Sequence, residues 1–95
     1  MEKAGGSALL IDVSNVADVA TLHQLLSSSF RFPDYYGGNW DAFDECIRDV
    51  EVPSSVVVRG IDSLAQRLPR EARLFVSCLS DFARERSGEV EVHVS

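Results

Sequence analysis

The sequence predicts a small α/β domain in which a three-stranded parallel sheet packs with about four helices. Three short apolar runs have the length and composition of strands, and two segments with helical periodicity separate each run from the next. Strands connected through helices form parallel sheets with right-handed crossovers. With 95 residues, the whole chain (1–95) is expected to form a single domain around one core, after a loose start at residues 1–6.

The first half of the chain predicts one strand followed by two helices. The continuous apolar run at 8–11 indicates a strand that is buried on both faces. Asp18 is a good N-cap for a helix over about 19–29, where apolar residues recur every three or four positions. A loop with two adjacent tyrosines then leads to Asn39, the predicted N-cap of the second helix. We expect one of these tyrosines to pack inward and the other to face solvent.

The second half of the chain predicts the remaining two strands and two helices. Three valines at 56–58 indicate a second strand buried on both faces, because β-branched side chains suit a pleated sheet that is covered on both sides. Asp62 is the predicted N-cap of a short helix over 63–68. A strong apolar stripe predicts a long helix over about 70–86, and strict alternation predicts a half-buried strand over 90–94.

Overall charge and composition argue against several classes of protein. Fifteen acids against nine bases give a net charge of −6, which disfavours binding to nucleic-acid phosphates. No apolar run is long enough for a signal peptide or a membrane span, so we expect a cytoplasmic protein. Cys46 and Cys78 lie in apolar stretches and are predicted to be buried thiols rather than a disulfide or metal ligands. No cofactor is expected.

Negative charge is concentrated in one short segment. Residues 34–51 hold one base, Arg48, and six acids: Asp34, Asp41, Asp44, Glu45, Asp49 and Glu51. Like charges at this density destabilise a fold through repulsion, and a cationic partner offsets that repulsion. Two tyrosines and a tryptophan lie in the same segment, a composition that is typical of protein-binding surfaces. The segment therefore predicts a surface that binds a basic protein.

Two other interpretations of these acids remain open. Asp41 and Glu45 lie four residues apart on one helical face, which is also compatible with an ordinary solvated surface. The same pair has the spacing of a hydrolase carboxylate pair, but the sequence predicts no apolar pocket around it of the kind that acid catalysis needs. No nucleophile-elbow or phosphate-loop motif is present, so we expect that the protein is not an enzyme.

The remaining polar and aromatic side chains have mainly structural interpretations. Trp40 shares a helical face with Phe43 and Ile47, so it belongs either to the core or to a binding interface. His23 is isolated on its helix with no partner motif, and a structural role is expected for it. The arginines of the last two helices are expected to pair with nearby acids, namely Glu71, Asp81 and Glu85.

The acidic segment also carries a resemblance to a known family. The run PDYYGGNWDAFDECI at 33–47, together with Leu22-His23-Gln24, closely resembles the barstar family of intracellular inhibitors of small secreted bacterial ribonucleases. Outside this run the similarity lies in the chain length and in the order of strands and helices, which match the three-stranded parallel sheet of that family. The resemblance implies that one helix and the loop before it enter the ribonuclease active site, where carboxylates replace RNA phosphates.

The resemblance implies a role for each matching residue. Tyr35 would pack on the catalytic groups of the ribonuclease, Asp41 would pair with an arginine, and Glu45 would be the main phosphate-mimicking acid. The same contact segment includes four more residues: Asn39, Trp40, Asp44 and Arg48. On the last helix, Asp81 is the best match for a peripheral contact acid, and the alternative is that it covers the edge of the core beside Phe82.

These matches imply an inhibitor that acts as a monomer in a 1:1 complex with a basic secreted ribonuclease, either barnase-like or guanyl-specific, without a nucleic-acid or membrane partner. Three positions depart from the family pattern. In the best-known member of the family, an aromatic residue occupies the position of Asp44 and a shorter acid occupies that of Glu45. An aliphatic contact residue is expected at the position of Trp40. The departures keep a second function open, that of a non-inhibitory adaptor or regulator that binds another basic protein through the same acidic surface.

Overall fold

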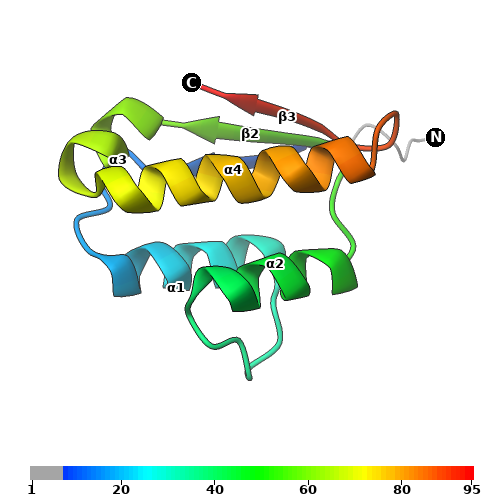
Figure 1. Ribbon diagram of the computed structural model, residues 1–95, viewed down its shortest axis with the longest axis horizontal. Helices are drawn as coiled ribbons and strands as arrows, with labels where there is room; N and C mark the ends of the chain where they lie inside the picture. Colours follow the sequence, from blue (N-terminus) through cyan, green and yellow to red (C-terminus); the bar gives the residue numbers. More distant parts are fainter. Residues whose placement is uncertain (1–7) are drawn as a thin grey trace.

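The computed structural model describes residues 8–95, and its elements follow the order expected from the sequence. They are β1 (Ala8–Asp12), α1 (Val19–Phe30), α2 (Trp40–Asp49), β2 (Ser55–Arg59), α3 (Ile61–Arg67), α4 (Pro69–Glu85) and β3 (Glu91–Val94) (Figure 1). The loose start expected at residues 1–6 lies outside the described residues. The predicted α/β fold, a three-stranded parallel sheet with four helices, is confirmed.

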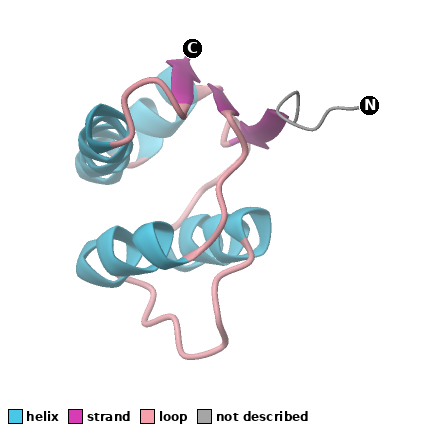
Figure 2. Cartoon of the chain, turned by 90° about the vertical axis from the view of Figure 1, so that its right-hand side faces the viewer, coloured by secondary structure: helices cyan, strands magenta, loops and turns pink. Residues whose placement is uncertain are grey.

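The sheet is parallel throughout and has the strand order β1-β2-β3. Ile11 of β1 lies opposite Val58 of β2, and Val56 of β2 lies opposite Val92 of β3. Helices α1, α2 and α4 gather on one side of this sheet, with α1 beside α2 and α4 beside α3 (Figure 2). Both crossovers therefore place their helices against the same face.

The one-sided arrangement corrects the prediction that the first two strands are buried on both faces. Ile11 and Val58 point toward the helices and are 1% and 0% exposed. Leu10, on the opposite face, is 54% exposed, and Val57 is partly exposed. A continuous apolar run indicates a doubly covered strand only when helices pack on both faces of the sheet. Here the helices share one face, so every second side chain of β1 and β2 meets solvent.

A hydrophobic core between the sheet and the helices fixes α2 against α4. Phe43 and Ile47 of α2, and Phe75, Leu79 and Phe82 of α4, are fully buried in it. The rings of Phe43 and Phe75 meet edge to face, with 5.9 Å between centroids and an interplanar angle of 89°, which aromatic pairs favour. Burial of each phenylalanine side chain contributes about 1.5–3 kcal/mol. This packing gives α2 a single orientation, with its other face turned outward.

The first two helices begin where the sequence predicted. Asp18 Oδ1 accepts a hydrogen bond from the backbone N–H of Thr21 at 2.8 Å. Asn39 Oδ1 accepts one from the backbone N–H of Ala42, also at 2.8 Å. These caps satisfy N–H groups that the first helical turn leaves unpaired, so the start of each helix is set by a local interaction.

The last two helices begin differently from the prediction. Asp62 is not the cap of α3, because this helix begins at Ile61 and its N-cap is Gly60. Gly60 has a φ of 85°, in the left-handed region that glycine adopts without strain. α4 begins at Pro69, one residue before its predicted start. Proline is well suited to a first helical position, because the N–H that it lacks would be unpaired there.

The cysteine prediction is confirmed for one residue and wrong for the other. Cys46 is buried, at 5% exposed, whereas Cys78 is only partly buried at the edge of the α4 apolar stripe. Both are free thiols, and burial is the main cause that raises the pKa of each. Within residues 8–95, no three metal-binding side chains cluster, and no helix is long and apolar enough to cross a membrane.

The close approach at Gly60 yields a stability prediction. A Cβ at this position would lie 2.6 Å from the Cβ of Ser14 and 2.7 Å from its backbone N and Cα. Gly60→Ala is therefore expected to lower the free energy of unfolding by about 2–5 kcal/mol, from left-handed strain and steric overlap together. Urea denaturation followed by tryptophan fluorescence measures the change.

Gly88→Ala is the matched control for this prediction. Gly88 has a similar φ of 88°, but beyond its two chain neighbours no atom of residues 8–95 lies within 4 Å of the added Cβ. Only the left-handed strain applies, so a loss of about 1–2 kcal/mol is expected. Equal losses for the two variants would contradict the proposed overlap between position 60 and Ser14.

Candidate functional site

Helix α2 separates an apolar face from a charged one. Phe43 and Ile47 are fully buried, while Asp41 and Glu45, one turn apart on the other side of the helix, are exposed. Within residues 8–95, neither of these two carboxylates has a hydrogen-bond or ion-pair partner. Both are therefore available to a cation from another molecule.

The loop before α2 turns one tyrosine outward and the other inward, as the sequence predicted. Tyr35 is 78% exposed. Tyr36 packs against Phe32, with 4.9 Å between ring centroids, and its hydroxyl lies 2.6 Å from Nδ1 of His23 on α1. Burial raises the pKa of Tyr36, so the hydroxyl stays protonated. The inward tyrosine anchors the loop to α1 and leaves the outward one at the surface.

His23 has closer partners than the sequence indicated. It is 4% exposed, and its ring lies 4.7 Å from that of Trp40 in addition to its hydrogen bond with Tyr36. Its Nε2 is buried and has no hydrogen-bond partner among residues 8–95. Burial lowers the pKa of His23, and the negative charge of Glu71 opposes this only in part. The neutral imidazole is therefore favoured, which supports the structural role expected for this residue.

Trp40 lies on the core side of α2. Its indole Nε1–H donates a hydrogen bond to Oε1 of Glu71 on α4 at 2.8 Å. The indole ring also stacks on Phe75, with 5.9 Å between centroids and an interplanar angle of 27°. Glu71 is only 8% exposed, and the hydrogen bond satisfies a carboxylate that would be costly to bury unpaired. Of the two interpretations open for Trp40, the geometry favours the core.

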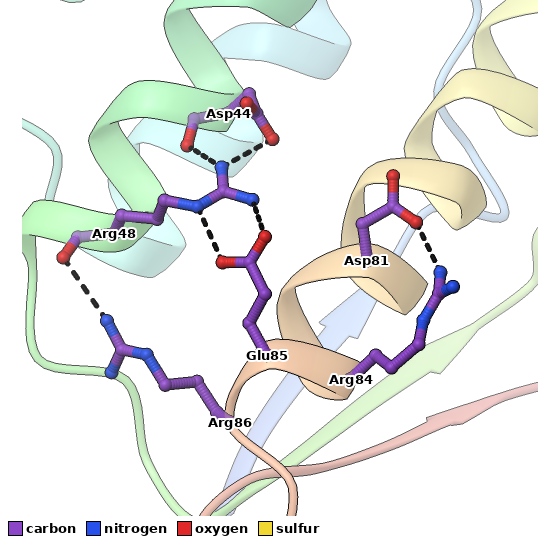
Figure 3. A network of polar contacts seen from close by, with 6 residues as sticks. All are labelled: Asp44, Arg48, Asp81, Arg84, Glu85 and Arg86. Carbon is purple, nitrogen blue, oxygen red and sulfur yellow. Dashed lines mark hydrogen bonds and ion pairs between the residues drawn. The ribbon is translucent and has the colours of Figure 1, made fainter.

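Arg48 and Asp44 lie toward α4, where both are already engaged (Figure 3). Arg48 Nε and Nη2 donate to the two carboxylate oxygens of Glu85, at 2.8 and 2.6 Å. Arg48 Nη1 lies 2.6 Å from Oδ1 of Asp44. The guanidinium lowers the pKa of Glu85, and its hydrogen bonds to the two carboxylates raise the pKa of Arg48. In the free chain, Arg48 is therefore paired with acids of the same protein.

Asp81 lies one turn before Glu85 on α4, with its side chain 55% exposed. It pairs with Arg84 of the same helix (Figure 3), and Arg70 pairs with Glu71 at 3.2 Å. The expected pairing of late arginines with nearby acids is confirmed for Arg70 and Arg84, whereas Arg67 donates to the backbone oxygen of Ser14 instead. Glu85 is the exception, because the arginine that binds it comes from α2. The exposure of Asp81 fits a surface acid better than one that covers the edge of the core.

The structure divides the predicted contact residues by what surrounds them. Three are exposed, with no hydrogen-bond or ion-pair partner within residues 8–95: Tyr35, Asp41 and Glu45. Asn39 is exposed but caps α2, and Trp40 is part of the core. The other three are held in ion pairs: Asp44, Arg48 and Asp81. The supporting acids Glu71 and Glu85 were not predicted as part of the site, because their contacts with α2 join positions 31 and 37 residues apart.

A small α/β domain with one outward acidic helix face, seated on a rigid core, has the features of a protein-binding module. Comparison with known proteins gives the family. The family described as "Barstar (barnase inhibitor)" matches residues 7–95, and the chain belongs to the Barstar family. Its members are inhibitors, so the expectation that the chain is not an enzyme is confirmed.

A curated relative is consistent with this assignment. A protein of Bacillus subtilis (strain 168) named "Putative ribonuclease inhibitor YrdF" is 33% identical to the chain over 55 residues. The alignment covers 57% of this chain and 60% of that relative, so the chain matches less than two thirds of the relative's length.

The buried imidazole of His23 predicts a pH dependence of stability. Because its folded-state pKa lies below the unfolded value of about 6.5, the unfolded chain takes up the proton first as pH falls. The free energy of unfolding is therefore expected to be highest above about pH 6.5 and to decrease toward pH 5. The pKa values of Asp12, Asp18 and Glu85 are also lowered, and protonation of these carboxylates reduces the stability only at lower pH.

Urea denaturation at pH 7.5 and pH 5 measures this loss. His93→Gln is the control, because it removes an exposed imidazole on β3, and the loss between pH 7.5 and pH 5 should persist in this variant. An NMR titration of the His23 ring tests the cause directly. Protonation of that ring at or above pH 6.5 would show that the assignment to His23 is wrong.

Proposed function

We propose that this protein inhibits a small, basic, secreted ribonuclease by covering its cationic active site with α2 and the loop before it. The observation that carries the proposal is that Asp41 and Glu45 are exposed carboxylates without a side-chain partner within residues 8–95, on a helix whose other face packs in the core. Membership of a family described as barnase inhibitors supports a ribonuclease as the target.

Rigid placement of Asp41 and Glu45 is the physical basis on which their carboxylates are proposed to mimic RNA phosphates. A ribonuclease active site must be positively charged to bind RNA phosphates, so a matched pair of carboxylates competes for the same cations. Fixed backbone geometry means that little conformational entropy is lost when the complex forms. Long-range attraction between a chain of charge −6 and a basic enzyme speeds their encounter at low salt.

Tyr35 supplies the apolar part of the proposed contact. Tyr35 is 78% exposed, although burial of an aromatic side chain is favourable in free energy. The adjacent Tyr36 is anchored to His23 by a hydrogen bond. A large aromatic held on an anchored loop can bury area against the nuclease with little loss of freedom. We propose Tyr35 as the packing anchor and Asp41 and Glu45 as the charged contacts of a 1:1 complex.

The alternative function is an adaptor that binds another basic protein without blocking an active site. One observation favours it: Asp44 and Arg48, which the resemblance places in the contact, are tied to each other and to Glu85. In both functions the protein acts as a monomer in the cytoplasm, and neither needs a cofactor. Inhibition of RNA cleavage separates the two.

The first prediction of the proposal concerns inhibition itself. Titration of the protein into a panel of barnase-like and guanyl-specific ribonucleases is expected to abolish RNA cleavage by at least one of them at a 1:1 ratio. The affinity should weaken between 50 mM and 500 mM NaCl, because screening shortens the range of the attraction. Binding to a nuclease without inhibition would support the adaptor, and failure against every nuclease at low salt would contradict the proposal.

The second prediction concerns the two free acids. Asp41→Ala and Glu45→Ala are each expected to weaken binding to an inhibited nuclease by more than about tenfold, the change produced by 1.4 kcal/mol. Glu91→Ala is the control, because it removes the same charge from an exposed position on β3, away from α2. If all three variants bind equally well, the contact lies elsewhere. Circular dichroism checks that each variant is folded.

A further inference from the structure

An ion-pair network centred on Arg48 connects the C-terminal halves of α2 and α4, beside the acidic face of α2 that is proposed to bind the ribonuclease. Arg48 uses all three guanidinium nitrogens within the chain: Nε and Nη2 on Glu85, and Nη1 on the side-chain and backbone oxygens of Asp44. Its side chain is 30% exposed, compared with 72% for Arg84 nearby. A guanidinium with this many short contacts has little capacity left for a partner.

The bridge connects two helices, unlike the neighbouring ion pair. Arg84 and Asp81 lie on one helix, three residues apart, and fix only each other's side chains. Arg48 and Glu85 are 37 residues apart and meet through a bidentate pair, which has a stricter geometry than a single contact. Arg86 adds a second link at the same end of α4, because its Nη2 donates to the backbone oxygen of Arg48 at 3.4 Å (Figure 3).

The bridge also decides which acids remain free. Arg48 pairs with Asp44 on its own helix and with Glu85 on α4, whereas Asp41, Glu45 and Asp49 of α2 are exposed and have no side-chain partner within residues 8–95. Without Arg48, Asp44 and Glu85 would lose this partner. With it, the acids of α2 that stay unpaired within residues 8–95 follow one strip along the helix, at positions 41, 45 and 49.

We propose that Arg48 is a positioning residue, which holds the C-terminal half of α2 on α4 and leaves the unpaired charge of α2 on the strip that carries Asp41 and Glu45. This inference rests on the proposed function only where it concerns binding. The six residues of this network comprise three acids and three bases, so the part of a partner that covers them meets little net charge (Figure 3). A partner cation at that point would have to compete with Arg48 for Asp44 and Glu85.

The conservative substitution Arg48→Lys tests the role, because lysine keeps the charge but cannot form the bidentate pair. Amide hydrogen exchange of the free protein is expected to be about three- to fivefold faster over residues 45–50, the effect of losing one such pair. Glu85→Gln should have the same effect, and Arg48→Lys combined with Glu85→Gln should have no larger one. Arg84→Lys is the matched control and should leave exchange over 45–50 unchanged.

Binding gives the second measurement, made with a ribonuclease that the unaltered chain inhibits. Arg48→Lys should raise the dissociation rate about three- to fivefold and leave the association rate unchanged, since net charge is preserved. Arg84→Lys should change neither rate. Equal exchange in the Arg48→Lys and Arg84→Lys variants, or slower dissociation of Arg48→Lys, would overturn the inference. If the unaltered chain binds no ribonuclease, the proposed function fails, while hydrogen exchange still decides the positioning role.

Discussion

The packing of α2 on α4 is the interaction on which the rest of this structure depends. Phe43 and Phe75 fill the space between the two helices, and Trp40 joins them with its ring on Phe75 and its N–H on Glu71. Dispersion and hydrophobic burial hold the helices together, and the hydrogen bond removes the freedom of Trp40 to turn outward. Because one face of α2 is held in this way, the other must face solvent.

Polar contacts at the two ends of α2 fix the position of this helix in addition to its apolar packing in the core. At the N-terminal end, Tyr36 binds the buried imidazole of His23, so the loop that carries Tyr35 is tied to α1. At the C-terminal end, Arg48 binds Glu85 of α4. Apolar packing alone tolerates small rotations of a helix, whereas these directional contacts do not. The acidic surface is therefore held by the core in the middle and by a polar contact at either end.

Charge on this surface is distributed less uniformly than its composition suggests. Residues 34–51 carry six acids and one base, yet that base satisfies Asp44 and an acid of another helix. Asp41 and Glu45 have no cationic partner within residues 8–95. Repulsion between them is an internal cost that binding to a basic protein removes, so the same charge weakens the free protein and favours the complex.

The sequence by itself determined the features that depend on neighbours along the chain. Apolar runs, helical spacing and capping residues indicated the order of helices and strands, the caps Asp18 and Asn39 marked two helix starts, and the run at 33–47 indicated the family. Each of these signals is local, because capping, amphipathic spacing and a short motif act over a few residues. Gly60 was missed as the start of α3 because its left-handed φ accompanies a close approach to Ser14, which no local pattern shows.

Only the tertiary structure decided which side chains of that local pattern are free to act. Which face of the sheet is covered, and hence the exposure of Leu10, depends on all crossovers packing on one side. The core position of Trp40 and the engagement of Arg48 depend on acids of α4 that lie 31 and 37 residues further along the chain. Spacing along a helix indicates which residues share a face. What that face meets is set by contacts between distant segments, and those exist only once the chain has folded.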